Sequence, residues 1–167
     1  SLIDWSDRNT CVLFGDGAGA VILTASQTPG LISNTIGSDG SYKDLLTVNT
    51  DTEVIEMRGN DVFKIAVNTM GELAKKTLEN SDYSVNNIDW LIPHQANSRI
   101  IKAVAKKINL SEDKIIMTVD KHGNTSAASI PLALDYGVNT GMVKKDHLII
   151  FEAFGAGFTW GSTLLKF

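Results

Sequence analysis

The clearest pattern in the chain is a helical repeat of apolar side chains that starts near residue 60. Apolar positions recur there every three or four residues and define one face: Phe63, Ala66, Val67, Met70, Leu73, Ala74 and Leu78. Asn60 or Asp61 can cap the first turn, so the pattern predicts a helix from 60 to about 79. A similar repeat predicts a second helix from residue 96 or 97 to about 108.

Short apolar runs predict strands on either side of this second helix. They cover residues 88–92, 115–119, 148–154 and 158–165. Gly155-Ala156-Gly157 predicts a tight turn between the last two runs, and small residues at 125–129 predict the start of a further helix. Strands alternating with helices predict an α/β domain whose mixed sheet is covered by helices on both faces.

The first part of the chain contains two apolar runs separated by a glycine-rich stretch. Residues 11–14 and 21–24 are expected to be strands, and residues 15–20 between them a turn or a close-packing point. The glycines match the loose dinucleotide-binding pattern G-x-G-x-x-A, but that pattern needs a helix next, and Pro29-Gly30 follows too soon. A dinucleotide-binding domain is therefore the least favoured interpretation.

Composition narrows the function classes. With 167 residues and 43% hydrophobic content, the chain can bury one ordinary core. The net charge of −4 and the lack of aromatic residues interleaved with Lys or Arg argue against a nucleic-acid surface. No apolar stretch approaches the roughly 20 residues of a bilayer span, so we expect no membrane segment.

Cysteine and histidine content adds three further expectations. The single cysteine, Cys11, cannot form an internal disulfide, which fits a reducing compartment and a cytoplasmic location. Cys11 lies in an apolar run, where a buried strand residue is expected. The three histidines lack the spacing of metal ligands, so no metal site is predicted.

His94 and Asn124 each follow a predicted strand, at the start of a strand-to-helix turn. A neutral imidazole and a carboxamide can each donate a hydrogen bond to a carbonyl oxygen that gains negative charge. With the glycine turn at 155–157, the two loops predict a pocket. Each residue also has a purely structural interpretation, as a hydrogen-bonded histidine at 94 and a helix N-cap at 124.

The predicted helix at 97–108 separates apolar from basic residues. Its basic face carries Arg99, Lys102, Lys106 and Lys107. This face is either an ordinary solvated surface or a docking site for an acidic partner.

Four motifs together make the chain resemble the C-terminal half of β-ketoacyl-acyl-carrier-protein synthase III, a thiolase-like condensing enzyme. They are Phe14-Gly15-Asp16-Gly17-Ala18-Gly19-Ala20, Pro93-His94-Gln95-Ala96-Asn97, His122-Gly123-Asn124-Thr125-Ser126 and Phe154-Gly155-Ala156-Gly157-Phe158-Thr159-Trp160-Gly161. The likeness covers nearly the whole chain. It implies a thiolase-like layered fold, with residues 1–24 at the end of the N-terminal half and 25–167 as the C-terminal half of a two-half, homodimeric enzyme.

The resemblance also implies a reaction. A cysteine in the N-terminal half of the family is acylated by an acyl-CoA primer, and malonyl-acyl-carrier protein is then decarboxylated and condensed onto it. His94 and Asn124 match the residues that hydrogen-bond the malonyl thioester oxygen and stabilise the enolate. An asparagine at 124, where elongating relatives have histidine, favours the initiating enzyme. CoA and malonyl-acyl-carrier protein are substrates, and no cofactor is implied.

Further positions acquire roles by the same resemblance. Those that match the pantetheine tunnel or the layer behind it are Gly59, Asn60, Phe63, Ala96, Asn97 and Phe154. The basic docking surface for the carrier protein is matched by Lys64, Arg99 and Lys107, beside Lys102 and Lys106 on the same helix face. The backbone N–H at Ala156 would serve the oxyanion of the acyl-cysteine. Ala156 replaces the middle one of three glycines common in the family, so its methyl group could narrow the pocket.

The nucleophile is missing, because Cys11 matches a strand position of the family and not its catalytic cysteine. We therefore expect the chain alone to be inactive and its partner to be an N-terminal half that carries the cysteine. Ser1 is not an initiator methionine, which suggests a piece of a longer polypeptide, or else a native protein with a processed start. The sequence also allows a non-catalytic CoA- or carrier-protein-binding module, or a self-contained acyltransferase that uses Cys11 with His94.

Overall fold

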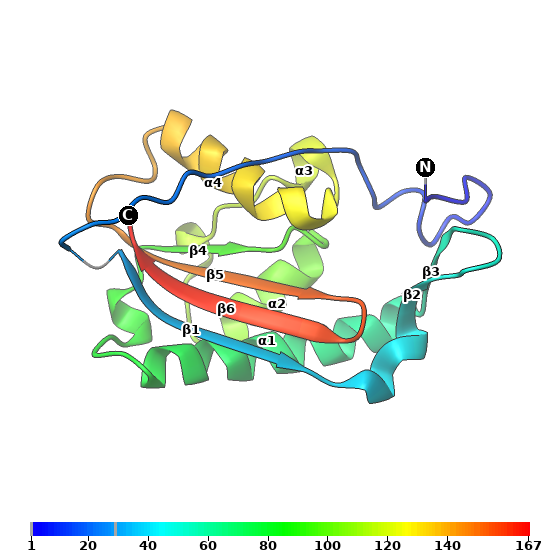
Figure 1. Cartoon of the computed structure of the whole chain (residues 1–167), viewed down its shortest axis with the longest axis horizontal. Coiled ribbons are helices and arrows are strands. Elements are labelled where there is room, and N and C mark those ends of the chain that lie inside the picture. Colours follow the sequence, from blue (N-terminus) through cyan, green and yellow to red (C-terminus); the bar gives the residue numbers. More distant parts are fainter. Residues whose placement is uncertain (1, 29) are drawn as a thin grey trace.

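The computed structural model describes residues 2–28 and 30–167. A four-stranded mixed sheet, in the order β1-β6-β5-β4, forms its centre (Figure 1). β6 pairs antiparallel with β1 and β5, whereas β4 and β5 are parallel. The strands are β1 (Leu31–Ser38), β4 (Trp90–Pro93), β5 (Leu148–Gly155) and β6 (Thr159–Lys166).

Helices cover both faces of this sheet, as the alternating pattern predicts. α1 (Gly59–Glu79) and α2 (Ser98–Lys107) pack on one face, and α4 (Ser129–Asn139) packs on the other (Figure 1). Successive side chains of β5 serve the two cores: Ile150 packs with Ile101 of α2, and Ile149 packs with Ala133 of α4. This two-sided burial explains the continuous apolar run of β5.

The predicted helices are confirmed to within about two residues. The repeat that starts near residue 60 corresponds to α1, and Asn97 is the N-cap of α2, where its side chain accepts the N–H of Ile100 at 2.9 Å. The helix expected at 125–129 begins as a 3₁₀ turn, Ser126–Ala128, and continues as α4. Pro131 is the third residue of α4, where its missing N–H would have no helical partner.

Several elements were not predicted. A small hairpin, β2 (Leu46–Val48) and β3 (Ile55–Met57), follows the 3₁₀ turn Gly40–Leu45, and α3 is the single turn Val119–His122. Two further 3₁₀ turns cover Val85–Asn87 and Glu112–Lys114. β1 escaped detection because its buried positions are polar, Ser33 and Thr35, while Ile36 is exposed. That inverted pattern gives no apolar alternation.

The strands predicted at 11–14 and 21–24 are wrong. Residues 8–13 form turns, Phe14 makes one isolated bridge to Asn124, and residues 15–26 are extended without a partner strand within the described chain. Val21, Ile22 and Leu23 are 62–92% exposed. The apolar run is real, but a strand needs a neighbour to satisfy its backbone groups, and no described strand lies beside it.

The glycines of this segment do act as close-packing points. The segment runs along α4 in Figure 1. A Cβ atom at Gly17 would collide with Thr125, and one at Gly19 would collide with Pro131. The segment stays extended beyond Ala20, so the helix that a dinucleotide site needs does not follow it.

The strand predicted at 115–119 is also wrong, although its first residue lies beside β4. Ile115 forms an isolated parallel bridge with Leu91, and the N–H of Ile116 donates to the Leu91 carbonyl at 3.0 Å. The ladder stops there because the side chain of Gln95 accepts the N–H groups of Thr118 and Val119. The chain then turns into α3.

Candidate active site

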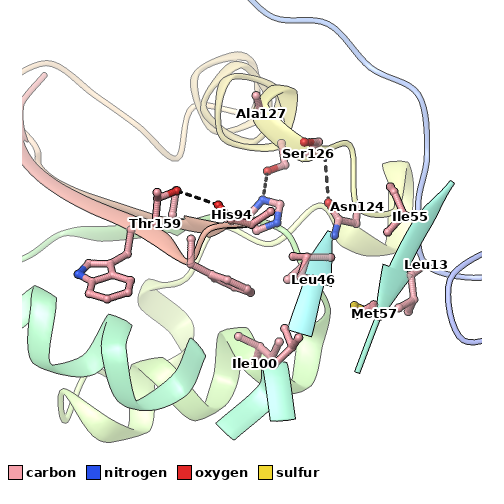
Figure 2. Close-up of a pocket in the computed structure, with 18 of the residues that line it drawn as sticks. Leu13, Leu46, Ile55, Met57, His94, Ile100, Asn124, Ser126, Ala127 and Thr159 are labelled. Carbon is pink, nitrogen blue, oxygen red and sulfur yellow. Dashed lines mark hydrogen bonds between the residues drawn. The ribbon is translucent and has the colours of Figure 1, made fainter. Parts of the chain in front are cut away.

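A cavity of about 1120 Å³ opens at the carboxyl ends of β4 and β5. Its walls come from the N-terminal segment, the β2–β3 hairpin, the β4–α2 loop, the turn before α4 and the β5–β6 hairpin. Figure 2 shows His94 and Asn124 among the side chains that line it. The structure therefore brings both predicted residues to one cavity, although 29 residues separate them in the sequence.

His94 is held on three sides. Its backbone N–H donates to the Glu152 carbonyl of β5 at 2.6 Å, which continues the β4–β5 pairing by one residue. Its Nδ1 lies 2.7 Å from the hydroxyl oxygen of Ser129, at the start of α4. The ring of Phe154 packs edge-to-face against the imidazole, with centroids 5.6 Å apart.

The environment favours the neutral form of the imidazole. Burial lowers the pKa of His94 to about 4, and a smaller interaction with the backbone of Ser126 acts in the opposite direction. At neutral pH the ring is uncharged, with one nitrogen as donor and one as acceptor. The neutral ring can therefore donate one hydrogen bond to an oxygen while its other nitrogen accepts one.

Asn124 is oriented by backbone contacts on both sides. Its N–H donates to Leu13 at 2.8 Å and its carbonyl accepts from Gly15 at 2.9 Å, so the N-terminal segment flanks it. Gly123, immediately before it, has a φ of +67°, a conformation that glycine adopts readily. The Asn124 Oδ1 accepts the N–H of Ser126 at 2.9 Å, which leaves its Nδ2 as a donor for the cavity.

Most of the other predicted binding positions also line the cavity: Gly59, Asn60, Ala96, Asn97, Phe154 and Ala156. Phe63 does not belong to the described lining residues. Its ring lies instead beneath the guanidinium of Arg99, with 5.4 Å from the Arg99 Cζ to the ring centroid. Asn97 combines two roles, because its Oδ1 caps α2.

Sequence reasoning missed one wall of the cavity and two buried polar residues, Ser129 in its lining and Gln95 outside the described lining. The β2–β3 hairpin contributes Leu46, Ile55 and Met57 to the lining, and no periodic pattern marked these residues in so short a hairpin. Gln95 and Ser129 are both 1% exposed and hydrogen-bonded. Gln95 stands next to His94 in the sequence, and this was the available signal for it.

The basic face of α2 is partly neutralised. Lys102 pairs with Glu112 at 2.8 Å, and Lys107 pairs with Glu72 at 3.5 Å and donates to Asn68 Oδ1. Among the described residues, no carboxylate pairs with the other three predicted docking cations, which are Lys64, Arg99 and Lys106.

Cys11 lies half-buried in a turn and is not among the described residues that line the cavity. Across residues 2–28 and 30–167, no three His, Cys, Asp or Glu side chains gather as metal ligands. In the same ranges, the helices are all too short or too polar to cross a bilayer.

A row of buried oxygens crosses the sheet beneath α1. Thr35, Ser162 and Glu152 are direct neighbours on β1, β6 and β5, and their side-chain oxygens have no partner among the described residues. Glu152 is 0% exposed, and burial raises the pKa of its carboxyl well above the usual value. Burial therefore favours the protonated, neutral form of the Glu152 side chain, while its backbone carbonyl accepts the N–H of His94.

Comparison with known proteins agrees with this geometry. The family model described as 3-oxoacyl-[acyl-carrier-protein] synthase III C terminal matches residues 78–167, and the model described as 3-oxoacyl-[acyl-carrier-protein] synthase III matches residues 1–40. The β-ketoacyl-[acyl-carrier-protein] synthase III of Thioalkalivibrio sulfidiphilus is 54% identical over 99% of this chain and 55% of its own length. That of Vesicomyosocius okutanii is 52% identical over 99% of this chain and 54% of its own length.

Solved structures give the same result. The crystal structure of 3-oxoacyl-[acyl-carrier-protein] synthase III from Aquifex aeolicus superposes with a TM-score of 0.96 at 44% identity, over 99% of this chain and 54% of that one. The Pseudomonas aeruginosa enzyme gives a TM-score of 0.90 at 35% identity, again over 99% and 54%. The chain spans about half the length of the relatives it matches. It has the thiolase-like α/β fold and belongs to the β-ketoacyl-acyl-carrier-protein synthase III family.

Proposed function

We propose that this chain supplies the decarboxylating half of an initiating condensing enzyme of fatty-acid synthesis. The observation that carries the proposal is the placement of two neutral hydrogen-bond donors, His94 and Asn124, on one largely apolar cavity. In the proposed reaction the malonyl carboxylate leaves as carbon dioxide, and the electron pair of the broken bond is held as an enolate. The enolate carbon then attacks an acyl-cysteine, and the cysteine thiolate leaves.

The role of His94 follows from the contacts of Ser129. The Ser129 hydroxyl oxygen accepts the Gln95 N–H at 3.2 Å, so its own proton is available for Nδ1 of His94. The neutral imidazole then carries its single N–H proton on Nε2, and this N–H donates to the thioester oxygen. The Nδ2 of Asn124 provides the second donor. Two fixed donors for one oxygen stabilise the enolate more than water does, because they need no reorientation.

Other lining residues receive roles that fit their positions. The backbone N–H of Ala156, in the β5–β6 turn, is the proposed donor to the oxyanion formed on the acyl-cysteine. Gly59, Asn60, Ala96, Asn97 and Phe154 form the proposed pantetheine site, with Phe63 near its outer edge beside Arg99. CoA and malonyl-acyl-carrier protein act as substrates, and the proposed reaction uses no cofactor.

The nucleophile comes from a separate N-terminal half in this proposal. Cys11 lies half-buried in a turn and is not among the described residues that line the cavity. Residues 1–24 form the end of that N-terminal half, and residues 25–167 form the C-terminal half. The exposed apolar residues Val21, Ile22 and Leu23 would pair with its sheet. The assembled enzyme is a cytoplasmic homodimer, and the isolated chain does not condense substrates.

The carrier-protein site is narrower than the sequence suggests. Lys64, Arg99 and Lys106 are exposed and carry charges that no described carboxylate neutralises, so they form the proposed contact with the acidic acyl-carrier protein. Lys102 and Lys107 contribute less, because Glu112 and Glu72 already pair with them.

The test is reconstitution. The chain is combined with the N-terminal half of the Thioalkalivibrio sulfidiphilus relative, both as two chains and as one joined polypeptide. Carbon dioxide release from malonyl-acyl-carrier protein and condensation with a primer acyl-CoA are then measured. We expect both activities in the assembled enzyme and neither in the isolated chain. Condensation by the isolated chain would contradict the proposal.

A non-catalytic CoA- or carrier-protein-binding module is the second candidate. The absence of Cys11 from the described cavity lining favours it over a self-contained cysteine acyltransferase. Assembly with the N-terminal half and binding of CoA, without any turnover, would support this second function and exclude the first.

A further inference from the structure

The side chain of Gln95 uses its whole amide group although it is 1% exposed. Its Nε2 donates to the carbonyl of Pro93 at 2.7 Å and to that of Ile116 at 3.3 Å. Its Oε1 accepts the N–H of Thr118 at 2.8 Å and that of Val119 at 3.2 Å. All these partners are backbone groups, so in these contacts the side chain of Gln95 bonds to the main chain of other segments and to no side chain.

These contacts join the two segments that carry the proposed donors. Pro93 immediately precedes His94, at the end of β4. Thr118 and Val119 begin α3, which ends at His122, one residue before the turn glycine that leads to Asn124. Backbone pairing with β4 stops at Ile116, and beyond this point the side-chain amide of Gln95 bonds the two segments instead. The amide therefore sets the spacing between the end of β4 and the start of α3.

The same residue is also tied to α4. The Gln95 N–H donates to the Ser129 hydroxyl, which contacts Nδ1 of His94. Gln95 thus contacts the segment that leads to Asn124 through its side chain and the first turn of α4 through its backbone N–H. The Ser129 hydroxyl that accepts this N–H also contacts the imidazole of His94.

We propose that Gln95 is a positioning residue that holds His94 and Asn124 at the separation needed to bind one oxygen atom together. This inference rests on the proposed decarboxylation. Two donors on separate loops act on the same oxygen only if the loops are held within a fraction of an ångström. Gln95 does not touch the substrate in this proposal, because it is not among the described residues that line the cavity.

The principal test is Gln95→Met in the assembled enzyme, because methionine has a similar length and volume but cannot form these hydrogen bonds. We expect carbon dioxide release to slow at least about tenfold in kcat, with KM for malonyl-acyl-carrier protein and the rate of cysteine acylation changed less than about twofold. An equal loss in acylation and decarboxylation would overturn the proposal.

Ser33→Ala is the matched control. The Ser33 hydroxyl is buried and donates to the Thr77 carbonyl at 2.8 Å, linking β1 to α1 away from the cavity. Loss of this bond should lower stability while leaving kcat for decarboxylation within about twofold. A comparable loss of kcat in Ser33→Ala would mean that any lost buried hydrogen bond slows the enzyme, and would overturn the positioning role.

A double-mutant cycle identifies the route of the effect. If Gln95 acts through the alignment of Asn124, Gln95→Met should cause less than about a twofold further loss in an Asn124→Ala background. A full, multiplicative loss in that background would overturn the proposal.

A second variant, Gln95→Glu, serves if Gln95→Met folds poorly, and NMR of the chain serves if the assembled enzyme is inactive. Gln95→Glu keeps the acceptor for Thr118 and Val119 but, when ionised, places negative charge against the Pro93 and Ile116 carbonyls, so its kcat should fall with rising pH, unlike that of the wild type. In the 167-residue chain, ¹⁵N NMR should show the His94 ring and Asn124 carboxamide signals shifted in either variant but not in Ser33→Ala. Unshifted signals in the Gln95 variants would overturn the positioning role. If these signals shift but the assembled wild-type enzyme is inactive, the result counts only against the proposed function.

Discussion

The hydroxyl oxygen of Ser129 lies 2.7 Å from Nδ1 of His94 and accepts the backbone N–H of Gln95 at the same time. Because the hydroxyl has one proton and the Gln95 contact uses an oxygen lone pair, the proton is free for Nδ1. With the pKa of His94 lowered to about 4 by burial, the ring is neutral at pH 7. We propose that Ser129 donates this proton to Nδ1 and so favours the form of the ring with its own proton on Nε2.

Ser129→Ala should therefore disturb the tautomer of His94. Without the hydroxyl, Nδ1 has no donor at this position, and ¹⁵N NMR should show a mixture of the two neutral forms. We expect decarboxylation by the assembled enzyme to slow about tenfold, and stability to fall by about 1 kcal/mol for the lost buried hydrogen bond. Ser81→Ala is the control, because its hydroxyl donates to Leu78 at the far end of α1. An unchanged tautomer in Ser129→Ala would contradict this role.

His94 should also make the stability of the chain depend on pH. Its folded-state pKa of about 4 is below the unfolded value of 6.5, so the unfolded chain binds the proton more readily. The contribution is complete above pH 6.5 and is lost as pH falls from 6.5 towards 4. We expect urea unfolding to show a loss on the order of 2 kcal/mol over this range.

The comparison of two variants isolates that contribution. His94→Gln should remove this part of the pH dependence, whereas His122→Gln, at an exposed position, should retain it. Identical pH profiles for wild type and His94→Gln would show that the imidazole is not buried as described.

The raised pKa of Glu152 should make the free energy of unfolding depend on pH in the opposite direction. Its folded-state pKa is raised, so the folded chain holds the proton more tightly, and the stability that this contributes is present below about pH 4.5 and lost as pH rises. Glu152→Gln keeps the shape without the titration and should raise the free energy of unfolding at pH 8 by roughly 1–2 kcal/mol. This gain should shrink towards pH 4.

Infrared spectroscopy provides a direct check on Glu152. A carbonyl band of a protonated carboxylic acid should be visible at pH 7 and disappear in Glu152→Gln. Glu79→Gln, at the exposed end of α1, should leave the band unchanged. Absence of the band from the wild type would mean that the carboxyl is ionised.

Charge reversal should map the carrier-protein surface. Lys64→Glu, Arg99→Glu and Lys106→Glu should each raise KM for malonyl-acyl-carrier protein about threefold to tenfold, with a smaller effect at high salt. The rate of acylation by a primer acyl-CoA should not change. Lys102→Glu should have a smaller effect on KM, because Lys102 already pairs with Glu112.

Lys145→Glu tests whether the effect is local. This lysine is exposed in the loop before β5, outside the basic face of α2, so its reversal should leave KM unchanged. Equal effects of Lys145→Glu and Arg99→Glu would indicate a general charge effect and not a docking surface.

Local patterns were sufficient for the parts of the fold that bury one continuous face. α1 and α2 were predictable because their apolar positions recur at helical spacing, and the β5–β6 hairpin because two apolar runs flank a glycine turn. β1 was not, because Ser33 and Thr35 point to the core and Ile36 does not. Its pairing depends on β6, which lies far along the chain.

The short motifs at 93–97 and 122–126 were sufficient to identify His94, Asn124 and the family. Each motif is a continuous stretch of the sequence, in which the functional residue stands beside turn residues. What the sequence determined is therefore local: helix faces, turns and the chemistry of single side chains. Only the tertiary structure decided three other features. They are the cavity shared by His94 and Asn124, the buried hydrogen bonds of Gln95 and Ser129, and the Glu152 carboxyl, which has no partner among the described residues. Burial and hydrogen-bond partners depend on segments distant in the chain, and these determine which donor is fixed and which pKa shifts.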